Sequence, residues 1–467
     1  MLLLGRRSVL AVSAVIAVFP GTCSSAAGAD WRTLGGDAAH TNFNPHERAL
    51  GRRHVRRLRL AWKVHLGGVI DTQPTYASRV PVGRDRLLNL VFVGTEHGGV
   101  FAIDAHSGQI VWHRRLRQQQ TRCFENTPDE RFGVSASPIV DRRRGRLYVI
   151  PADNAIHALS LSTGREANRW PLRLGLDPAS YHVWGSPTLV GHRLYVPIAS
   201  YCDQGSYRGG VQLTDVRDPR IIRGWWVVGP ASQGGAIWGW GGAPVDVVDG
   251  SVYVATGNAQ GRTEDVGYAE HVVRLTPDLR VLAADDPDVG PRSDADFSSA
   301  PLLFRTPGCA PFLAAIHKRG LLFIYRRHAI DRGPVQEIQV GDVSTLEASG
   351  TFAWSPSQQT IYVTADNRGF HGIVALHVSK CRLKPSWRVD LHRSMWTPSP
   401  PTVANGVVYF GTGRDAEVVA LNASTGKLLW RSRKLIRGPL YAAPTVIDGG
   451  LFAASWDQHL YAFTAKR

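Results

Sequence analysis

A short pattern of apolar and polar residues recurs along the chain, and its clearest copy runs from Val407 to Trp430 (VVYFGTGRDAEVVALNASTGKLLW). Two apolar runs that alternate with small or polar residues, Val407–Gly411 and Val418–Asn422, flank a polar turn, which is typical of a β-hairpin. A second turn, Ser424–Gly426, leads into a third strand that ends at Trp430. So small a sheet cannot bury both faces, and we expect its copies to pack on one another.

The same pattern recurs at Val91–Trp112 and, more loosely, at Leu147–Trp170. Each unit begins with a small residue, a proline and an apolar residue, and proline suits the first position of a strand. The starting prolines are Pro74, Pro138, Pro187, Pro244, Pro301, Pro356, Pro401 and Pro444. Their separations of 43 to 64 residues suit a four-stranded propeller blade with its loops.

The two ends of the chain carry complementary parts of one further unit. LRLAWKVHL, at Leu58–Leu66, ends like a unit but lacks the earlier strands, and Ala442–Phe463 begins a unit but lacks the last strand. An open solenoid would not need complementary parts of one unit at its two ends, whereas a closed ring can use them to complete its last sheet. The sequence therefore predicts an all-β protein with little helix, an eight-bladed β-propeller of four-stranded antiparallel blades that is closed by the N- and C-terminal strands.

The first 29 residues are typical of an export signal. Arg6 and Arg7 precede an apolar run, and small residues lead to Ala29, where we expect cleavage. Residues 1–29 are thus predicted to be a signal peptide that carries Cys23 away, and residues 30–467 a single propeller. The twin-arginine route and the ordinary secretory route both stay open. No later apolar run is long enough to span a bilayer, so we expect the mature protein outside the cytoplasm, in the periplasm, the cell envelope or the medium.

Four cysteines remain after that cleavage, an even number that suits an oxidising compartment. Of the three possible pairings we favour Cys123 with Cys202 and Cys309 with Cys381, because each pair lies in neighbouring units. The sequence has no CxxC or CxxCH motif, which leaves thiol redox chemistry, zinc ribbons and covalently attached haem without support.

The formal net charge is +16, from 54 basic and 38 acidic residues. Such a balance can indicate nucleic acid or an anionic surface as a partner. The arginines are scattered over turns and strand ends, as at Arg142–Arg144, with no stripe of interleaved aromatic residues. We therefore expect an arginine-rich solvated surface with some affinity for anionic envelope polymers, and no nucleic acid partner.

Sequences such as VYFGTG, VVALNASTG and LLW resemble the pyrroloquinoline quinone (PQQ) repeat propellers of the quinoprotein alcohol dehydrogenase-like superfamily, over nearly all of the mature chain. That superfamily includes quinone-dependent dehydrogenases, polyvinyl alcohol dehydrogenase-like proteins and non-catalytic assembly factors of the BamB type. The shared units therefore indicate a fold and leave the chemistry to particular residues.

The segment Gly234–Asn258 is similar to the part of quinoprotein dehydrogenases that supplies a tryptophan beneath the cofactor and an asparagine to calcium. The resemblance implies Trp238 as the floor, with Trp240 as second choice, and Asn258 as a metal ligand. A planar quinone suits a flat aromatic surface, and calcium suits oxygen ligands. The alternative is that these tryptophans are packing anchors of a blade.

Two further segments resemble catalytic parts of that family. Asp296 lies where the dehydrogenases place the carboxylate that takes the substrate's hydroxyl proton, and it is also an expected calcium ligand. Lys318 lies where the family places a cation over the quinone oxygens, with Arg319 as the alternative. A solvated acidic loop and an exposed basic turn are the respective alternatives.

Upstream, Asp203 and Arg208 are reminiscent of the family's acidic calcium ligand and of its arginine partner for a cofactor carboxylate. The match is weaker here, because the interval is one residue longer and the acid is an aspartate instead of a glutamate. The chain also departs from the family's alcohol dehydrogenases, since it has neither their two adjacent cysteines nor a haem module.

Two functions follow from the resemblance and stay open at this point. The first is a dehydrogenase that binds PQQ and calcium, oxidises a small-molecule or polymer hydroxyl group and passes electrons to a separate acceptor. The second is a non-catalytic, BamB-like scaffold that binds envelope proteins or anionic polymers through its rim loops. The middle units favour the first, and the missing cysteine pair and haem favour the second.

Overall fold

The computed structural model describes residues 29–121, 129–239, 241–260, 265–289, 296–297, 299–340, 352–367, 370–392, 399–413 and 415–465. Within these ranges the fold is all-β, and its helical parts are three short 3-10 turns, η1 (Val55–Arg57), η2 (Ile330–Arg332) and η3 (Arg433–Leu435). Among the described residues, no helix has the length and apolar character that crossing a membrane requires.

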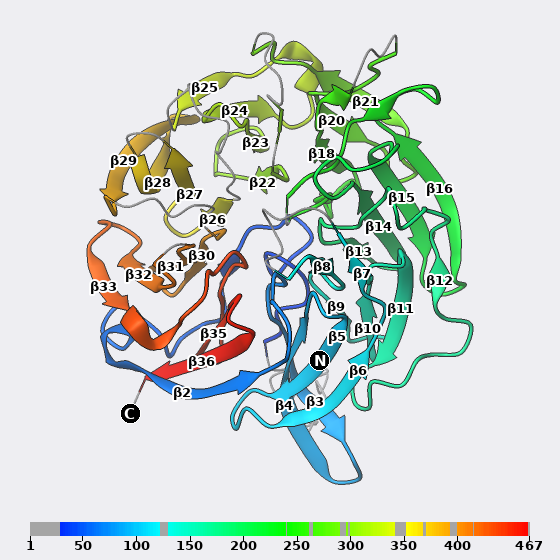
Figure 1. Cartoon of the computed structure of the whole chain (residues 1–467). Coiled ribbons are helices and arrows are strands. Elements are labelled where there is room, and N and C mark those ends of the chain that lie inside the picture. Colours follow the sequence, from blue (N-terminus) through cyan, green and yellow to red (C-terminus); the bar gives the residue numbers. More distant parts are fainter. Residues whose placement is uncertain are drawn as a thin grey trace, which may run out of the picture.

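The strands form eight sheets arranged as blades around a ring, as Figure 1 shows. The first four blades are blade 1, β3 (Thr75–Val82), β4 (Arg86–Gly94), β5 (Gly99–Asp104) and β6 (Ile110–Arg115); blade 2, β9 (Ile139–Asp141), β10 (Arg146–Val149), β11 (Ala155–Ser160) and β12 (Leu172–Arg173); blade 3, β13 (Thr188–Val190), β14 (Arg193–Ile198), β15 (Gly210–Asp215) and β16 (Arg220–Trp226); and blade 4, β18 (Val252–Ala255), β20 (Val272–Leu275) and β21 (Val281–Asp285). In blade 4 the first strand is reduced to an isolated bridge of Val245 with Val252.

The remaining blades follow the same order. They are blade 5, β22 (Leu302–Phe304), β23 (Phe312–Ile316), β24 (Leu321–Arg326) and β25 (Gln336–Gln339); blade 6, β26 (Phe352–Ser355), β27 (Thr360–Asn367), β28 (Phe370–Ser379) and β29 (Arg382–Asp390); blade 7, β30 (Thr402–Ala404), β31 (Val407–Gly411), β32 (Val418–Asn422) and β33 (Leu428–Arg431), with β1 (Phe43–Asn44) added parallel to β30; and blade 8, β34 (Thr445–Ile447), β35 (Gly450–Ala454), β36 (His459–Ala465) and β2 (Leu58–His65). Two short antiparallel pairs lie outside the blades, the hairpin of β7 (Gln119–Gln120) with β8 (Arg131–Phe132) and the pair of β17 (Gln233–Gly234) with β19 (Ala259–Gln260).

The ends of the chain close the ring, as the sequence predicted. The N-terminal strand β2 pairs antiparallel with the C-terminal strand β36, from Leu58 opposite Ala465 to His65 opposite His459. Because β2 supplies the outer strand of blade 8, this sheet has no strand missing. The prediction of an eight-bladed propeller is confirmed.

Seven of the eight predicted unit starts lie where the sequence placed them, directly before the first strand or bridge of a blade, and one is wrong. Pro356 follows β26 and lies in the turn 356–359 between the first two strands of blade 6. The other starting prolines precede a residue that enters a strand, whereas Pro356 precedes Ser357. A proline in a turn, where its fixed φ suits the backbone, explains the misplacement.

Tryptophans on the outer strands join each blade to the next. Trp112 on β6 donates its indole N–H to the carbonyl of Leu161 in blade 2, at 2.8 Å. Its ring lies against Gly164, where φ is +64° and a Cβ would approach the indole to 2.6 Å. The indoles of Trp62, Trp387 and Trp430 donate in the same way to the following blade. In blades 1, 6, 7 and 8 the tryptophan of the outer strand therefore links one blade to the next.

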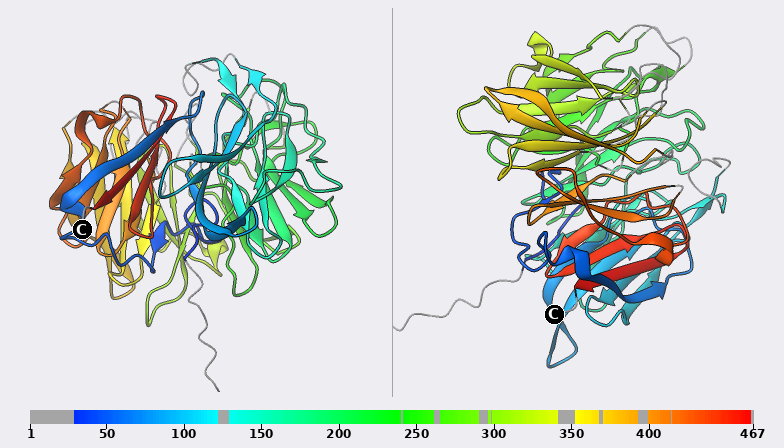
Figure 2. Two further views of the ribbon diagram at one scale, coloured as in Figure 1. Left: turned by 90° about the horizontal axis from the view of Figure 1, so that it is seen from below. Right: turned by 90° about the vertical axis from the view of Figure 1, so that its left-hand side faces the viewer.

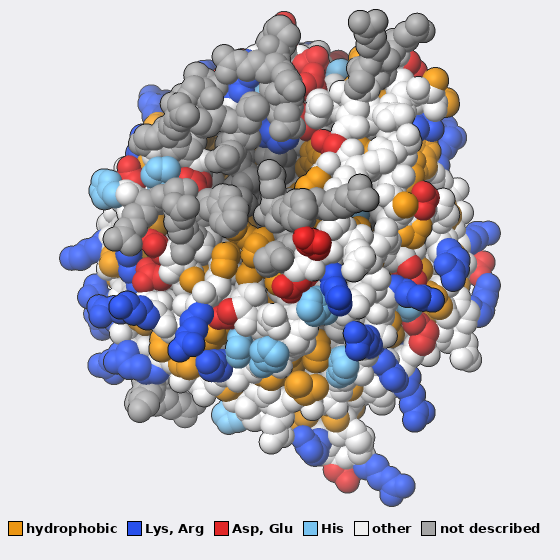
Figure 3. Space-filling model, in the orientation of Figure 1, with side chains coloured by type: hydrophobic (Ala, Val, Ile, Leu, Met, Phe, Trp, Pro, Cys, Tyr) orange, Lys and Arg blue, Asp and Glu red, His pale blue; other side chains and the backbone are white. Residues whose placement is uncertain are grey.

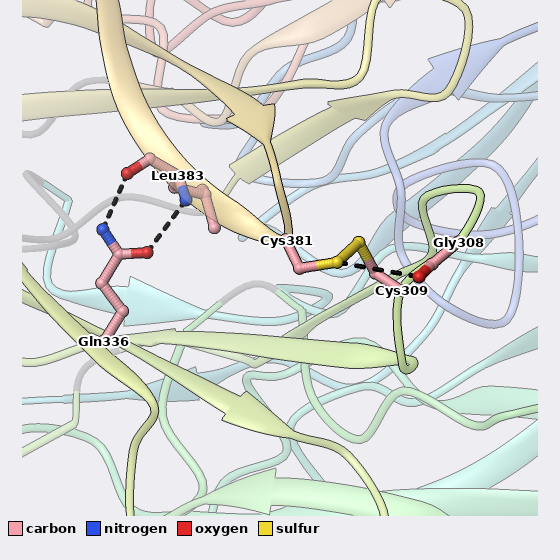
Figure 4. Close-up of a disulfide and its surroundings, with 5 residues drawn as sticks. All are labelled: Gly308, Cys309, Gln336, Cys381 and Leu383. Carbon is pink, nitrogen blue, oxygen red and sulfur yellow. Dashed lines mark hydrogen bonds between the residues drawn. A yellow bond between two sulfur atoms is a disulfide. The ribbon is translucent and has the colours of Figure 1, made fainter.

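A disulfide and a pair of hydrogen bonds join blade 5 to blade 6 (Figure 4). Cys309 is bonded to Cys381, as the sequence analysis favoured. Beside this bridge the Gln336 side chain on β25 donates to the Leu383 carbonyl at 2.7 Å and accepts from the Leu383 N–H at 2.9 Å. The other favoured bridge involves Cys123, which lies outside the described residues, so that bridge stays a prediction.

The segment 31–44 fills the centre of the ring from one end. It pairs with the first strands of the blades, as in the backbone bonds from Trp31 to Tyr76 and from Val403 to Asn42. Buried Asn44 also donates to the Val446 carbonyl at 2.7 Å. In the left panel of Figure 2 this dark blue segment lies at the lower end of the ring, and the cyan β7–β8 hairpin lies at the opposite end. We call that opposite end, which faces the viewer in Figure 1, the front end.

Candidate functional site

Two kinds of loop from every blade lie at the front end. Since the four strands of a blade run alternately up and down, the loop that enters the first strand and the turn after the second strand lie at the same end. Trp238 and Asp296 lie in loops that enter blades 4 and 5, and Asn258 and Lys318 follow the second strands of those blades. The topology therefore brings four residues that are distant in sequence to one place.

A buried ion pair forms the centre of the site. The Lys318 Nζ atom lies 2.7 Å from Oδ1 of Asp296, and the Asp296 side chain is fully buried. The backbone holds the same two residues together, because the Lys318 N–H donates to the Asp296 carbonyl at 2.9 Å. An isolated bridge of Phe297 with His317 continues this pairing. The position of the carboxylate is thus fixed by main chain as well as by charge.

Asn258 and Trp238 adjoin this carboxylate. The Asn258 N–H donates to Oδ2 of Asp296 at 3.1 Å. At Gly257, a Cβ would come within 2.6 Å of the Trp238 indole nitrogen and 3.0 Å of Oδ2 of Asp296. Only glycine fits between them, and its lack of a side chain lets the half-buried Trp238 indole lie close to the Asp296 carboxylate.

Asp203 and Arg208 lie near this centre, but their side chains are engaged elsewhere. Asp203 accepts a hydrogen bond from the Tyr207 hydroxyl, and the Tyr207 ring lies edge-on to the Trp238 ring, with centroids 6.5 Å apart. The Arg208 guanidinium donates to the Val228 carbonyl at 3.0 Å and lies over the Trp226 ring. Asp203 is thus linked to the site through Tyr207, and the Arg208 guanidinium does not contact Asp296.

Arg319 and Trp240 were the alternatives to Lys318 and Trp238 in the sequence analysis. Arg319 donates to the carbonyl of Val289, whereas Lys318 carries the contact with Asp296. Trp240 lies outside the described residues, and its place as second choice for the aromatic floor stays a prediction.

The sequence analysis missed another buried acidic site at the front end, which consists of two carboxyl groups. Asp71 precedes the first strand of blade 1, and Glu96 follows the second strand of the same blade. Burial raises the pKa of Asp71 to about 6, against hydrogen bonds that lower it. Burial and the charge of Asp71 raise the pKa of Glu96 well above its ordinary value. The pair therefore holds a proton more tightly than exposed carboxyl groups do.

Aromatic rings connect the two carboxyl sites. Trp184 lies edge-on to Trp238, with ring centroids 6.2 Å apart, and its ring is also 6.2 Å from that of Tyr201. Burial raises the pKa of Tyr201 well above its ordinary value, and the charges of Glu96 and Asp71 raise it further. On the far side, the Trp456 indole donates to Oδ1 of Asp71 at 2.5 Å. The front end is therefore an aromatic floor between two buried acidic groups.

Sequence signals for these missed residues are present in retrospect. Glu96 stands in the turn after the second strand of blade 1, the same place that Asn258 has in blade 4. Asp71 stands just ahead of the first unit start, as Asp296 stands ahead of a later one. Position within the unit could have identified both, although no family motif marked them.

Two family models match parts of the chain. The family described as glucose/ethanol/alcohol dehydrogenase, beta-propeller domain, matches residues 31–174, and the family described as outer membrane protein assembly factor BamB matches residues 382–467. The resemblance to the PQQ repeat propellers is confirmed. The two matches cover different parts of the chain, which meet in blade 8. One family is of dehydrogenases and the other of assembly factors, so the matches support the shared fold and do not decide the chemistry.

Solved structures of similar proteins agree with this. The quinohemoprotein alcohol dehydrogenase from Comamonas testosteroni has 17% identity and a TM-score of 0.73, over 95% of this chain and 81% of that chain. A europium-containing methanol dehydrogenase has 15% identity and a TM-score of 0.74, over 94% and 98%. BamB from Moraxella catarrhalis has 14% identity and a TM-score of 0.56, over 88% and 98%. At these identities the likeness shows the fold alone. No curated protein matches the sequence.

Proposed function

We propose that the protein is an exported, quinoprotein-type dehydrogenase that binds PQQ and calcium at the front end of the propeller and oxidises the hydroxyl group of an alcohol or sugar. The observation that supports this most directly is the buried contact of Lys318 with Asp296, beside Asn258 and Trp238. Lys318 and Asn258, both chosen from the resemblance to one family, thus contact Asp296, and Trp238 lies on the other side of Gly257.

The residue types at this site fit the two proposed groups. Calcium binds carboxylate and amide oxygens, and the side chains of Asp296 and Asn258 offer both. A planar tricyclic cofactor needs a flat apolar support, and Trp238 is half-buried beside Gly257. We propose that Trp238 supports the cofactor and that Asn258 and Asp296 hold the metal, with Asp203 as a further ligand if its bond to Tyr207 is released.

In the proposed reaction a bound quinone would supply the hydride acceptor, and the residues of the chain would manage the proton and the charge. Asp296 would accept the proton of the substrate hydroxyl on a carboxylate oxygen. Lys318 would keep this buried carboxylate ionised, because a cation 2.7 Å away favours the charged form. Burial would exclude water from the carboxylate. The chain has no CxxCH motif, so we propose a separate electron acceptor.

The proposed setting is outside the cytoplasm. Residues 1–29 would act as the export signal and residues 30–467 as the mature propeller. The disulfide of Cys309 with Cys381 is compatible with an oxidising compartment.

A second candidate function is a BamB-like scaffold in the cell envelope, and the match of residues 382–467 to the BamB family supports it. In that case the front-end loops would bind envelope proteins, and the buried ion pair would serve stability alone. The two candidates differ in whether Asp296 is needed for a chemical reaction or only for the fold.

A dye-linked oxidation assay tests the proposal. The purified protein, supplied with PQQ and calcium, is offered a panel of primary alcohols and sugars, beside Asp296→Asn and an exposed control, Asp85→Asn. The dehydrogenase proposal expects turnover that falls roughly 1,000-fold or more in Asp296→Asn, since a general base is lost, and that is unchanged in the control. Folded protein without turnover on any member of the panel would favour the scaffold.

A further inference from the structure

The outer edge of blades 7 and 8 carries a cluster of exposed cations that the sequence analysis took for scattered charge. We call it the basic patch, and its members are Arg52, Arg53, Arg56, Arg57, Arg59 and Lys427, all of which are exposed. The sequence has no Asp or Glu from residue 48 to 70 or from 418 to 447. The surroundings contributed by these two segments are therefore uniformly positive.

The fold fixes four of the five arginines, Arg52, Arg53, Arg56 and Arg57, on a strap that is tied down at both ends, and Arg59 follows the strap on β2. Tyr409 donates its hydroxyl to the Leu50 carbonyl at 3.2 Å, and the Trp430 indole donates to the Leu58 carbonyl, also at 3.2 Å. Between these ties, Val55 is fully buried, and Leu50 and Leu58 are almost so. Because the apolar side chains of the strap face inward, the arginines between them must face outward.

Lys427 joins this patch from the neighbouring blade. It immediately precedes β33, and η1, which carries Arg56 and Arg57, contacts β33. Leu428, the first residue of β33, keeps 47% of its surface exposed, which places an apolar side chain beside the cations. Figure 3 shows Lys and Arg side chains gathered at the lower left of the front view, on the side where β33 and β2 lie in Figure 1.

The patch contrasts with those exposed arginines of the protein that have carboxylate partners. Among the latter, Arg169 is paired with Asp218 at 2.6 Å and Arg217 with Asp215 at 2.8 Å. Within the part of the chain that the structure describes, no ion pair involves a member of the basic patch. Six like charges repel one another. An anionic partner would reduce this electrostatic repulsion.

We propose that the basic patch docks the protein on a membrane surface that carries anionic phospholipid headgroups. Guanidinium groups bind phosphate oxygens in a bidentate manner, and clustered cations on a protein surface bind anionic lipid with a contribution from each residue. In a fluid membrane the headgroups can move sideways to contact all six cations. Exposed Leu428 can enter the interface between headgroups and acyl chains. This docking is independent of the proposed dehydrogenase function.

Vesicle co-sedimentation tests the docking. The protein as purified is mixed with vesicles of phosphatidylcholine alone or with roughly 30 mol% phosphatidylglycerol. The test variant neutralises Arg52, Arg53, Arg56 and Arg57 to Gln. A matched control neutralises four exposed arginines on blades 1 and 2, namely Arg84, Arg86, Arg115 and Arg173, so that both variants lose the same net charge. Thermal unfolding checks that both remain folded.

The proposal expects binding to the anionic vesicles only, weakened roughly 100-fold or more in the patch variant and changed little in the control. Binding should also weaken as salt screens the charges, and Leu428→Ser should weaken it further. Equal loss in both variants would show a net-charge effect and overturn the proposal. Binding to soluble inorganic polyphosphate without binding to vesicles would overturn it as well, in favour of a soluble polyanion.

Discussion

Lys318 Nζ lies 2.7 Å from Oδ1 of Asp296, and the two side chains differ sharply in burial, at 17% and 0% exposed. The carboxylate therefore depends on a cation that retains some contact with water. Such a pair is expensive to break from the exposed side, because the buried carboxylate then loses the positive charge of Lys318.

Removal of the lysine charge should consequently destabilise the fold. Lys318→Met is expected to lower the free energy of unfolding by about 3 to 5 kcal/mol, and the double variant Lys318→Met with Asp296→Asn should recover part of that loss. Denaturant unfolding measures both. The control is Lys63→Met, an exposed lysine on β2, which should cost under about 1 kcal/mol. A Lys318→Met cost no greater than that of the control would mean that the pair does not hold the carboxylate.

The contact between Trp112 and Gly164 should be a mechanical link between blades 1 and 2. Gly145→Ala and Gly164→Ala share nearly the same backbone cost, since φ is +63° and +64°, but only at Gly164 would the new methyl group meet the indole. We expect about 1 kcal/mol for Gly145→Ala and about 2 kcal/mol more for Gly164→Ala. Urea unfolding compares the two variants. Equal costs would show that the indole moves aside without loss.

Much of this architecture could be predicted from the sequence, because strand pattern and turn residues are local. The bounds of β31 and β32 were predicted correctly from alternation alone, and the complementary termini predicted the pairing of β2 with β36. Pro356 was misassigned because a proline in a turn and a proline before a strand look alike. The path of residues 31–44 through the ring was missed because that segment has no periodicity.

The site was only partly predictable, for a physical reason. The resemblance selected Trp238, Asn258, Asp296 and Lys318, of which Asn258 and Lys318 contact Asp296. The direction of each side chain depends on neighbours that the sequence does not reveal. The backbone of Arg208 runs near the site, but its guanidinium group donates a hydrogen bond to the Val228 carbonyl. Glu96 occupies a polar turn, where a solvated carboxylate is the ordinary expectation, and its burial arises from packing across the ring.

The buried Asp71 and Glu96 pair should make stability depend on pH. Burial raises the pKa of Asp71 from 3.8 to about 6, so the folded state binds a proton more tightly than the unfolded state does. The resulting stabilisation is present below about pH 4 and is lost as the pH rises through about 6.

Asp71→Asn should remove the part of this dependence that Asp71 contributes, while it keeps an acceptor for the Trp456 indole. We expect the variant to be more stable than the parent at pH 7.5, by up to about 3 kcal/mol, and to differ little at pH 4. The melting temperature across this range is the measurement, with Asp85→Asn as the exposed control. A parent protein that gains stability relative to Asp71→Asn as the pH rises would contradict the assignment.

The most direct test of the central claim is a fluorescence and calorimetric titration of the purified protein with PQQ in the presence of calcium. The account predicts saturable uptake of one PQQ per chain with quenching of tryptophan emission, weakened roughly 100-fold in Trp238→Ala and in Asp296→Asn when calcium is limiting. Trp226→Ala, a half-buried tryptophan on the outer strand β16, should bind as the parent does. No uptake, or equal uptake by Trp238→Ala and Trp226→Ala, would contradict a cofactor site at the front end.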